Sequence, residues 1–321
     1  MAGKSRARLA ALSPRRYSLA GRKSKVGIRD LALPHKRGAS LKKFLGSLPR
    51  QLAAIELLDA ARAIADAHRN KRPVILGFGG HVIKVGLAPL LIDLMGRGVL
   101  TALCANGAGM IHDFELAYAG KTSENVEEAI SDGAFGFAEE TGRILNEAVR
   151  DGAARGLGIG AAAGGKINQL KAPYAKKSVF AQAARMNVPI TVHVAIGTDI
   201  VHMHPEADGA AWGKAAFADF NAFCNLVADL EGGVFINMGS AVILPEVFLK
   251  AVSEARNRGH ALKRITTVDM DFIKQYRPQT NVVRRPTAQG GRGISLTGHH
   301  EIMGPLLFAA VIEALTGGRR K

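Results

Sequence analysis

Short runs of apolar residues alternate along the chain with longer segments in which apolar positions recur at helical spacing. The short runs are rich in Val, Ile, Leu and Phe, which is typical of parallel strands buried on both faces. Strands are predicted at 74–78, 99–105, 188–196, 233–238 and 264–269. Helices are predicted at 48–67, 82–95, 178–186, 209–230, 245–259 and 301–316, with two more between 122 and 151.

Strands that alternate with helices predict right-handed crossovers and a parallel sheet. We therefore expect an α/β fold with a Rossmann-like parallel sheet and helices on both faces. The Gly- and Ala-rich segment 152–175 is predicted to be a loop. It contains Gly160–Lys166, close to the phosphate-binding pattern G-x-x-x-x-G-K, but Ile167 replaces the metal-binding hydroxyl, so a flexible loop is the stronger expectation. No element is predicted for 273–299.

The positive charge is concentrated at the N-terminus. The formal net charge is +16, and residues 1–43 hold thirteen Lys or Arg and one acid. We expect a basic arm at 1–45 and a single nucleotide-binding-like domain at 46–321. The arm could be a transit peptide, a polyanion-binding segment or an oligomer-docking extension, and any nucleic-acid binding is expected only here. Its one aromatic residue before Phe44, Tyr17, gives little surface for base stacking.

Two features bear on the cellular compartment. The chain has two cysteines, Cys104 and Cys224, which lie far apart in apolar segments, so a disulfide framework is not expected. We therefore expect a reducing, cytoplasmic location. No apolar run is long enough to span a bilayer, so no contact with the membrane is expected.

Candidate binding residues follow the predicted strands, because ligands of open parallel sheets bind at the carboxyl ends of the strands. The usual dinucleotide fingerprint is absent, since Val82 stands where its third glycine would be. The residues expected nearest a nucleotide are Gly79, Gly80, His81, Asn106, Gly107, Gly109, Gly239, Ser240 and Asp269.

The densest polar cluster lies at 197–208. On an extended chain His202 and His204 would point the same way, and with Asp199 and Asp208 they could bind zinc or another divalent metal. Alternatively, these side chains hydrogen-bond locally or line a cleft without metal.

In order and spacing, residues 70–315 resemble the deoxyhypusine synthase family. The resemblance rests on the glycine-bounded segment 80–86, the small-residue turn 105–109, the late strand and glycine turn 233–242, and the strand 265–269. It implies a Rossmann-like core, a homotetramer with NAD between subunits, and oxidation of spermidine followed by transfer of its aminobutyl group to a lysine of a translation factor.

The chain departs from that family at its reactive lysine. The family's Trp-Gly-Lys motif lies near the C-terminus, where the matching position here is Ile294, and Trp212-Gly213-Lys214 lies in another part of the predicted fold. Without that lysine the family's covalent imine cannot form, which indicates a divergent member.

The leading hypothesis is therefore an NAD-binding transferase or oxidoreductase that acts on an amine, a polyamine or a similar small molecule. Asp199, His202, His204, His299 and His300 are the expected catalytic residues nearest the substrate. The alternatives are a metal-dependent hydrolase that uses Asp199, His202, His204 and Asp208, or a non-enzymatic oligomeric scaffold with a basic binding arm.

Overall fold

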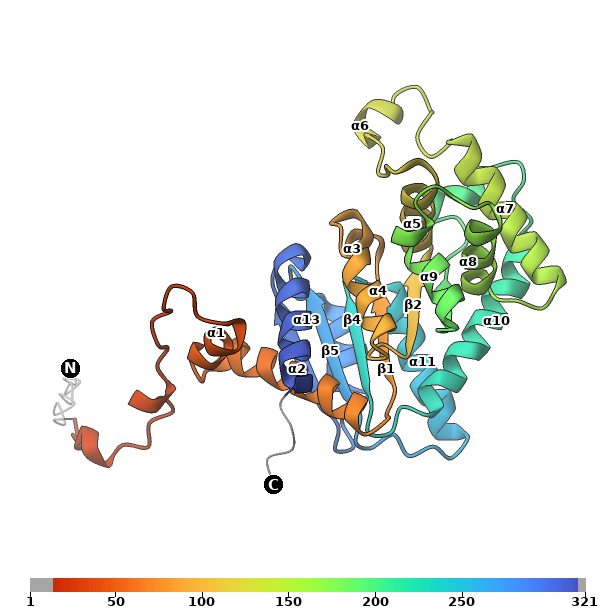
Figure 1. The fold of residues 1–321 in the computed structure, drawn as a ribbon. Coiled ribbons are helices and arrows are strands. Elements are labelled where there is room, and N and C mark those ends of the chain that lie inside the picture. The colour runs from red at the N-terminus through yellow and green to blue at the C-terminus, as the bar shows by residue number, and fades with distance from the viewer. Residues whose placement is uncertain (1–13, 317–321) are drawn as a thin grey trace, which may run out of the picture.

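A computed structural model describes residues 14–316 and contains one six-stranded sheet in which every pairing is parallel (Figure 1). The strands are β1 (Val74–Phe78), β2 (Ala102–Asn106), β3 (Ile190–His193), β4 (Val234–Met238), β5 (Thr266–Asp271) and β6 (Arg292–Thr297). Their order across the sheet is β3-β2-β1-β4-β5-β6. The predicted α/β, Rossmann-like fold is confirmed.

The strand order reverses between β1 and β4. The chain runs outward from β1 through β2 to β3, and then returns to add β4, β5 and β6 on the other side of β1. In register, Phe78 lies beside Ala105 of β2 and Met238 of β4, so these three strands end together. Such a reversal opens a crevice at the carboxyl edge of the sheet, where doubly wound proteins bind their ligands.

Helices cover both faces of the sheet, and alternate strand residues divide between two apolar cores. Leu76 and Phe78 of β1 belong to the larger core, and Ile75 belongs to the smaller one. The larger core receives side chains from α2 (Leu52–Arg69), α4 (Ala88–Gly96), α5 (Gly107–Ala119), α9 (Val179–Met186) and α13 (His300–Thr316). The smaller core receives them from α10 (Gly209–Ala228) and α11 (Ile243–Asn257). Burial on both faces explains the continuous apolar runs of the strands.

The predicted loop at 152–175 is wrong, because α8 (Ile159–Gln169) follows α7 (Glu139–Ala154) there. Its small residues allow close packing. A Cβ at Gly160 would lie 2.0 Å from the carbonyl oxygen of Ile190 in β3, and one at Gly164 would lie 2.5 Å from that of Phe180 in α9. The Gly/Ala composition that suggested a loop instead lets a helix lie directly against a strand and a second helix.

Other elements also differ from the prediction. The helix expected at 82–95 is two helices, α3 (Gly80–Lys84) and α4, separated by Gly86 at φ +83°. Helix α5 and strand β6 were not predicted, and residues 273–299 also contain α12 (Tyr276–Pro278) and a π-helix at Gln279–Arg284. The two helices predicted between 122 and 151 are present as α6 (Val126–Ala129), which is shorter than expected, and α7.

The N-terminal segment extends away from the sheet (Figure 1). Its described part, from residue 14, is largely exposed up to α1 (Leu41–Ser47), which packs against α13 and buries Leu45. Within residues 14–316 no helix has the length and apolar character needed to cross a bilayer.

Candidate functional site

At the reversal of strand order, two glycine turns touch each other. A Cβ on Gly79, after β1, would lie 2.3 Å from the carbonyl oxygen of Gly239, after β4. The Gly79 N–H donates to the Met238 carbonyl at 3.0 Å, and Gly239 has φ +69°. The two turns therefore pack main chain against main chain, and the His300 ring lies 3.0 Å from where a Cβ on Gly239 would be.

Two histidines flank these turns. His81, in the first turn of α3, is exposed, whereas His300, the first residue of α13, is 1% exposed. Their ring centroids are 5.4 Å apart, and Phe272 lies beside both rings at 6.4 and 6.5 Å. Partial burial, and then the neighbouring His300, lower the pKa of His81 below its ordinary value.

A row of buried polar side chains holds the glycine turn after β4 in place. Asn237 of β4 donates through Nδ2 to the Ser240 carbonyl at 2.9 Å and to Asp269 of β5 at 2.8 Å. The other Asp269 oxygen accepts from Gln279 at 3.0 Å, and burial raises the pKa of Asp269 to about 6. Ser240 and Asp269, expected at the nucleotide, are thus buried and hold the β4 turn in place.

The second cluster forms at the start of α5, where the structure brings Asp199 against the predicted turn. Asn106 caps the helix by accepting from the Gly109 N–H at 2.9 Å, and a Cβ on Gly107 would lie 2.3 Å from Oδ2 of Asp199. Within residues 14–316 no group donates a hydrogen bond to the Asp199 carboxylate, and burial raises its pKa to about 6. A carboxylate already occupies this helix start, which favours a cationic group over a phosphate there.

The two clusters adjoin. A Cβ on Gly80 would lie 2.9 Å from Cβ of Ala108 and 3.0 Å from Cδ2 of His112, both on α5. Of the predicted residues, the structure therefore gathers Gly79, Gly80, His81, Gly239, Ser240 and His300 at the β1/β4 reversal, and Asn106, Gly107, Gly109 and Asp199 beside it.

The expectation that His202 and His204 point the same way is wrong, because residues 200–203 form a 3-10 helix instead of an extended chain. His204 is buried and donates through Nε2 to the Gly136 carbonyl at 2.9 Å. The His202 ring packs edge-on against Trp212, with 4.7 Å between the ring centroids. The side chain of His299 is 71% exposed.

The structure does not support a metal site in this cluster. Asp208 caps α10 by accepting the N–H groups of Ala210 and Ala211. Across residues 14–316, no three His, Cys, Asp or Glu side chains are grouped so as to hold a metal ion. The proposed ligand set is therefore not assembled.

A short polar network that was not predicted lies further along α5. Both oxygens of Glu115, on α5, accept hydrogen bonds, one from Thr122 and the other from Thr141 at 3.0 Å, and His112 donates to Thr122 at 2.7 Å. Burial alone would raise the pKa of Glu115, but the His112, Thr122 and Thr141 contacts outweigh it and lower that pKa. Glu115 thus holds together the two ends of the connecting segment between α5 and α7, residues 120–138. Sequence alone does not reveal this network, because Thr122 and Thr141 lie 7 and 26 residues beyond Glu115 and no motif links them.

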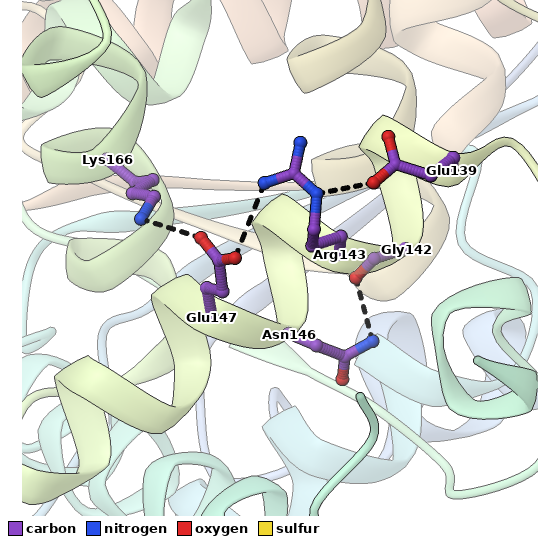
Figure 2. A network of polar contacts seen from close by, with 6 residues as sticks. All are labelled: Glu139, Gly142, Arg143, Asn146, Glu147 and Lys166. Carbon is purple, nitrogen blue, oxygen red and sulfur yellow. Dashed lines mark hydrogen bonds and ion pairs between the residues drawn. The ribbon is translucent and has the colours of Figure 1, made fainter. Parts of the chain in front are cut away.

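The Gly-Lys motif also has a structural role (Figure 2). Lys166 of α8 pairs with Glu147 of α7 at 3.1 Å, and Glu147 in turn contacts Arg143, which bonds Glu139. Behind this network the buried Asn146 donates to the Gly142 and Val201 carbonyls, at 2.9 and 2.8 Å, and accepts from Trp212 at 2.7 Å. The lysine that suggested a phosphate loop therefore joins two helices.

Two buried carboxylates serve as helix caps. Asp113 accepts from Ser178 and from the Val179 and Phe180 N–H groups at the start of α9. Asp219 accepts from the Gly160 N–H at 3.0 Å and the Val192 N–H at 2.8 Å, which joins α10 to α8 and β3. Two shallow hollows, one between α1, α2 and α13 and one within residues 33–47, lie away from the strand ends.

No protein-family model and no curated protein matches the sequence. Among solved structures, AgrE in its ternary complex with ornithine and NAD+ is 13% identical at a TM-score of 0.51, with 84% of this chain and 34% of AgrE covered. A conserved LOR/SDH protein of Methanococcus maripaludis S2 is 14% identical at a TM-score of 0.51, with 82% and 70% covered. A protein assigned as a deoxyhypusine synthase from Entamoeba histolytica is 12% identical at a TM-score of 0.49, with 88% and 96% covered.

This chain spans about a third of the length of AgrE. At such identities the likenesses concern architecture alone. What the comparisons show is that the chain shares an α/β, Rossmann-like fold with AgrE and the LOR/SDH protein.

Proposed function

We propose that this chain is an enzyme that binds NAD at the β1/β4 reversal and oxidises a small amine held beside Asp199. The observation that carries the proposal is the contact between the glycine turns at Gly79 and Gly239, at the one point where the strand order reverses. Two neighbouring glycine turns let a dinucleotide approach the main chain of both strands.

The surroundings of the turns fit a dinucleotide. The large apolar side chains of Val242, Phe272 and Ile302 are 45%, 50% and 63% exposed, and can cover flat rings. Lys84 lies close enough to His81 to act on its charge and, being exposed, can meet a phosphate. When bound, NAD would supply the hydride acceptor, and the protein would supply orientation and proton handling. AgrE, which has the same fold, is seen with NAD+.

The amine is inferred from Asp199. An unpaired, half-buried carboxylate beside the reversal attracts an ammonium group, and AgrE is seen with ornithine, which carries amino groups. The transfer of an aminobutyl group through a lysine imine is not part of this proposal, because Ile294 stands where that lysine would be.

Isothermal titration calorimetry with NAD+ and NADH tests the cofactor. We expect saturable binding of both, with native mass spectrometry showing one dinucleotide per chain. The same spectra report the homo-oligomer that we propose, with a tetramer favoured. No heat from either nucleotide at millimolar concentration would refute the proposal.

Asp199 gives a pH-dependent prediction. Its carboxylate ionises as the pH rises through about 6, so the affinity for an amine such as ornithine or spermidine should increase between pH 5 and 7. Asp199→Asn should remove this dependence and weaken amine binding roughly 10- to 100-fold, the range for a charge-assisted hydrogen bond, without weakening NAD binding.

The matched control is Asp132→Asn, because Asp132 is an exposed acid in the segment that connects α5 to α7. This variant should bind amines with unchanged affinity. Folding provides a second check. The pKa of Asp199 is raised in the folded state, so its ionisation costs stability as the pH rises toward 7, and Asp199→Asn should be at least as stable as the wild type at neutral pH. Unchanged amine affinity in Asp199→Asn would remove the substrate part of the proposal.

A further inference from the structure

His300 is a buried imidazole with one nitrogen bonded and the other unpartnered. Its Nε2 lies 3.1 Å from the carbonyl oxygen of Met270, which can only accept, so Nε2 carries the proton. Its Nδ1 is buried and has no hydrogen-bond partner within residues 14–316. An unsatisfied acceptor in a fully buried side chain is costly, which points to a donor that the resting arrangement does not yet supply.

A carboxylate reinforces this arrangement of protons. Oδ1 of Asp271, at the end of β5, is 3.9 Å from Nε2 of His300 and accepts the Phe272 N–H at 2.8 Å. The carbonyl and the carboxylate thus both lie on the Nε2 side of the ring. The same division of roles, with an acid behind one nitrogen and a free lone pair on the other, fixes the tautomer of catalytic histidines.

His81 is the group that can satisfy Nδ1. With ring centroids 5.4 Å apart, there is room for one N–H···N hydrogen bond between the two imidazoles after a rotation of the exposed His81 side chain. That bond would leave the second nitrogen of His81 unprotonated and facing the exposed side. The charged groups acting on His81 are Lys84 on its own helix, Asp271 on β5 and Glu301 on α13, together with His300.

We propose that His81 is the base that takes a proton from the substrate amine, and that His300 positions it by accepting its ring N–H at Nδ1. In this step an N–H bond of the substrate ammonium breaks, the electron pair stays on the amine nitrogen, and the proton bonds to the free nitrogen of His81. The positive charge then rests on His81 and is stabilised by the Nδ1 acceptor of His300 and by the Asp271 carboxylate. This inference rests on the proposed function for its substrate, but the coupling of the two histidines does not.

The coupling can be measured in the free protein by NMR of 15N-labelled histidine side chains. We expect the neutral form of His300 to be the Nε2–H tautomer, and His81 to titrate below its ordinary pKa. His300→Phe removes the acceptor, so the tautomer ratio and the pKa of His81 should both change. His300→Gln retains an acceptor oxygen and should restore the wild-type tautomer of His81. His260→Gln, an exposed histidine preceding β5, is the control and should leave the signals of His81 unchanged.

Kinetics give the second measurement once a substrate amine is found. His81→Gln should lower kcat about 10²- to 10⁴-fold, the usual loss for a proton-transfer group. His300→Phe should move the acidic limb of the pH profile of kcat/KM by the same amount as the pKa of His81 measured by NMR. An Nδ1–H tautomer of His300, or a His81 titration unaffected by His300→Phe in a folded variant, would overturn the inference. Intact coupling without NAD binding would instead refute only the proposed function.

Discussion

Replacing Asp219 with alanine is expected to lower the free energy of unfolding by about 2–5 kcal/mol, because it leaves buried backbone N–H groups without an acceptor. The groups are those of Gly160 in α8 and Val192 in β3, and the side chain fits a space in which a Cβ on Gly158 would lie 1.8 Å from Oδ1 of Asp219. Both N–H groups donate to the same oxygen, Oδ2 of Asp219, so this one side chain joins α8 to β3. Urea unfolding followed by circular dichroism measures the loss.

The effect should depend on pH. Burial raises the pKa of Asp219 to about 7 in the folded protein, above its value in the unfolded chain. The resulting contribution to stability is full at low pH and is lost as the pH rises through about 7, so the difference between wild type and variant should shrink from pH 5 to pH 8. Asp229→Ala, just beyond the end of the same helix and exposed, is the control and should change stability by less than about 0.5 kcal/mol. Equal stability of the two variants would contradict the capping role.

Gly79→Ala is expected to abolish NAD binding, with a loss of affinity of at least about 100-fold, and to lower stability by about 1–3 kcal/mol. The added Cβ would lie 2.3 Å from the Gly239 oxygen and 3.0 Å from its carbon, and neither backbone atom can rotate away. The turns after β1 and β4 would have to separate. Calorimetry with NAD+ and thermal unfolding measure the two effects.

Gly165→Ala is the matched control. Gly165 lies in the middle of α8 with nothing within 4 Å of a Cβ, so alanine should leave NAD binding unchanged and stabilise the helix by about 0.5–1 kcal/mol. If Gly79→Ala remained folded and bound NAD with full affinity, the β1/β4 reversal would not be the nucleotide site.

The strands that sequence predicted best are those with the least ambiguous physical signal. β1 was predicted to the residue, because Val74–Phe78 is apolar throughout and bounded by Pro73 and Gly79. β6 was missed for the opposite reason. It is an edge strand with burial on one side only, and its glycine and polar residues resemble those of a loop.

For helices, glycine was the misleading residue. Gly107 and Gly109 open α5, and Gly160 and Gly164 belong to α8. The segment that contains Gly160 and Gly164 was predicted to be a loop because glycine disfavours helices, yet a Cβ at either position would collide with the backbone of a neighbouring element. Only the tertiary contacts distinguish the two uses.

The candidate site was predictable where it depends on topology, and not where it depends on long-range contacts. Residues after β1 and β4 meet because parallel strands end at a common edge, so Gly79, His81 and Gly239 could be named from sequence. The approach of Asp199 to Gly107, and that of Asp271 to His300, join residues 92 and 29 positions apart, and no local pattern signals them.

Because Glu115 holds its two ends together, the segment that connects α5 to α7 can be replaced without disturbing the rest of the fold. Thr122 and Thr141 donate to the two oxygens of one carboxylate, so the segment between them begins and ends at nearly the same point. Its length and composition can change at little entropic cost, because closing a loop depends only weakly on loop length. Six acids now lie between those two threonines. Evolution could therefore replace the segment between Thr122 and Thr141 with another and so change which ligands the protein binds, while the sheet and its helices stay unchanged.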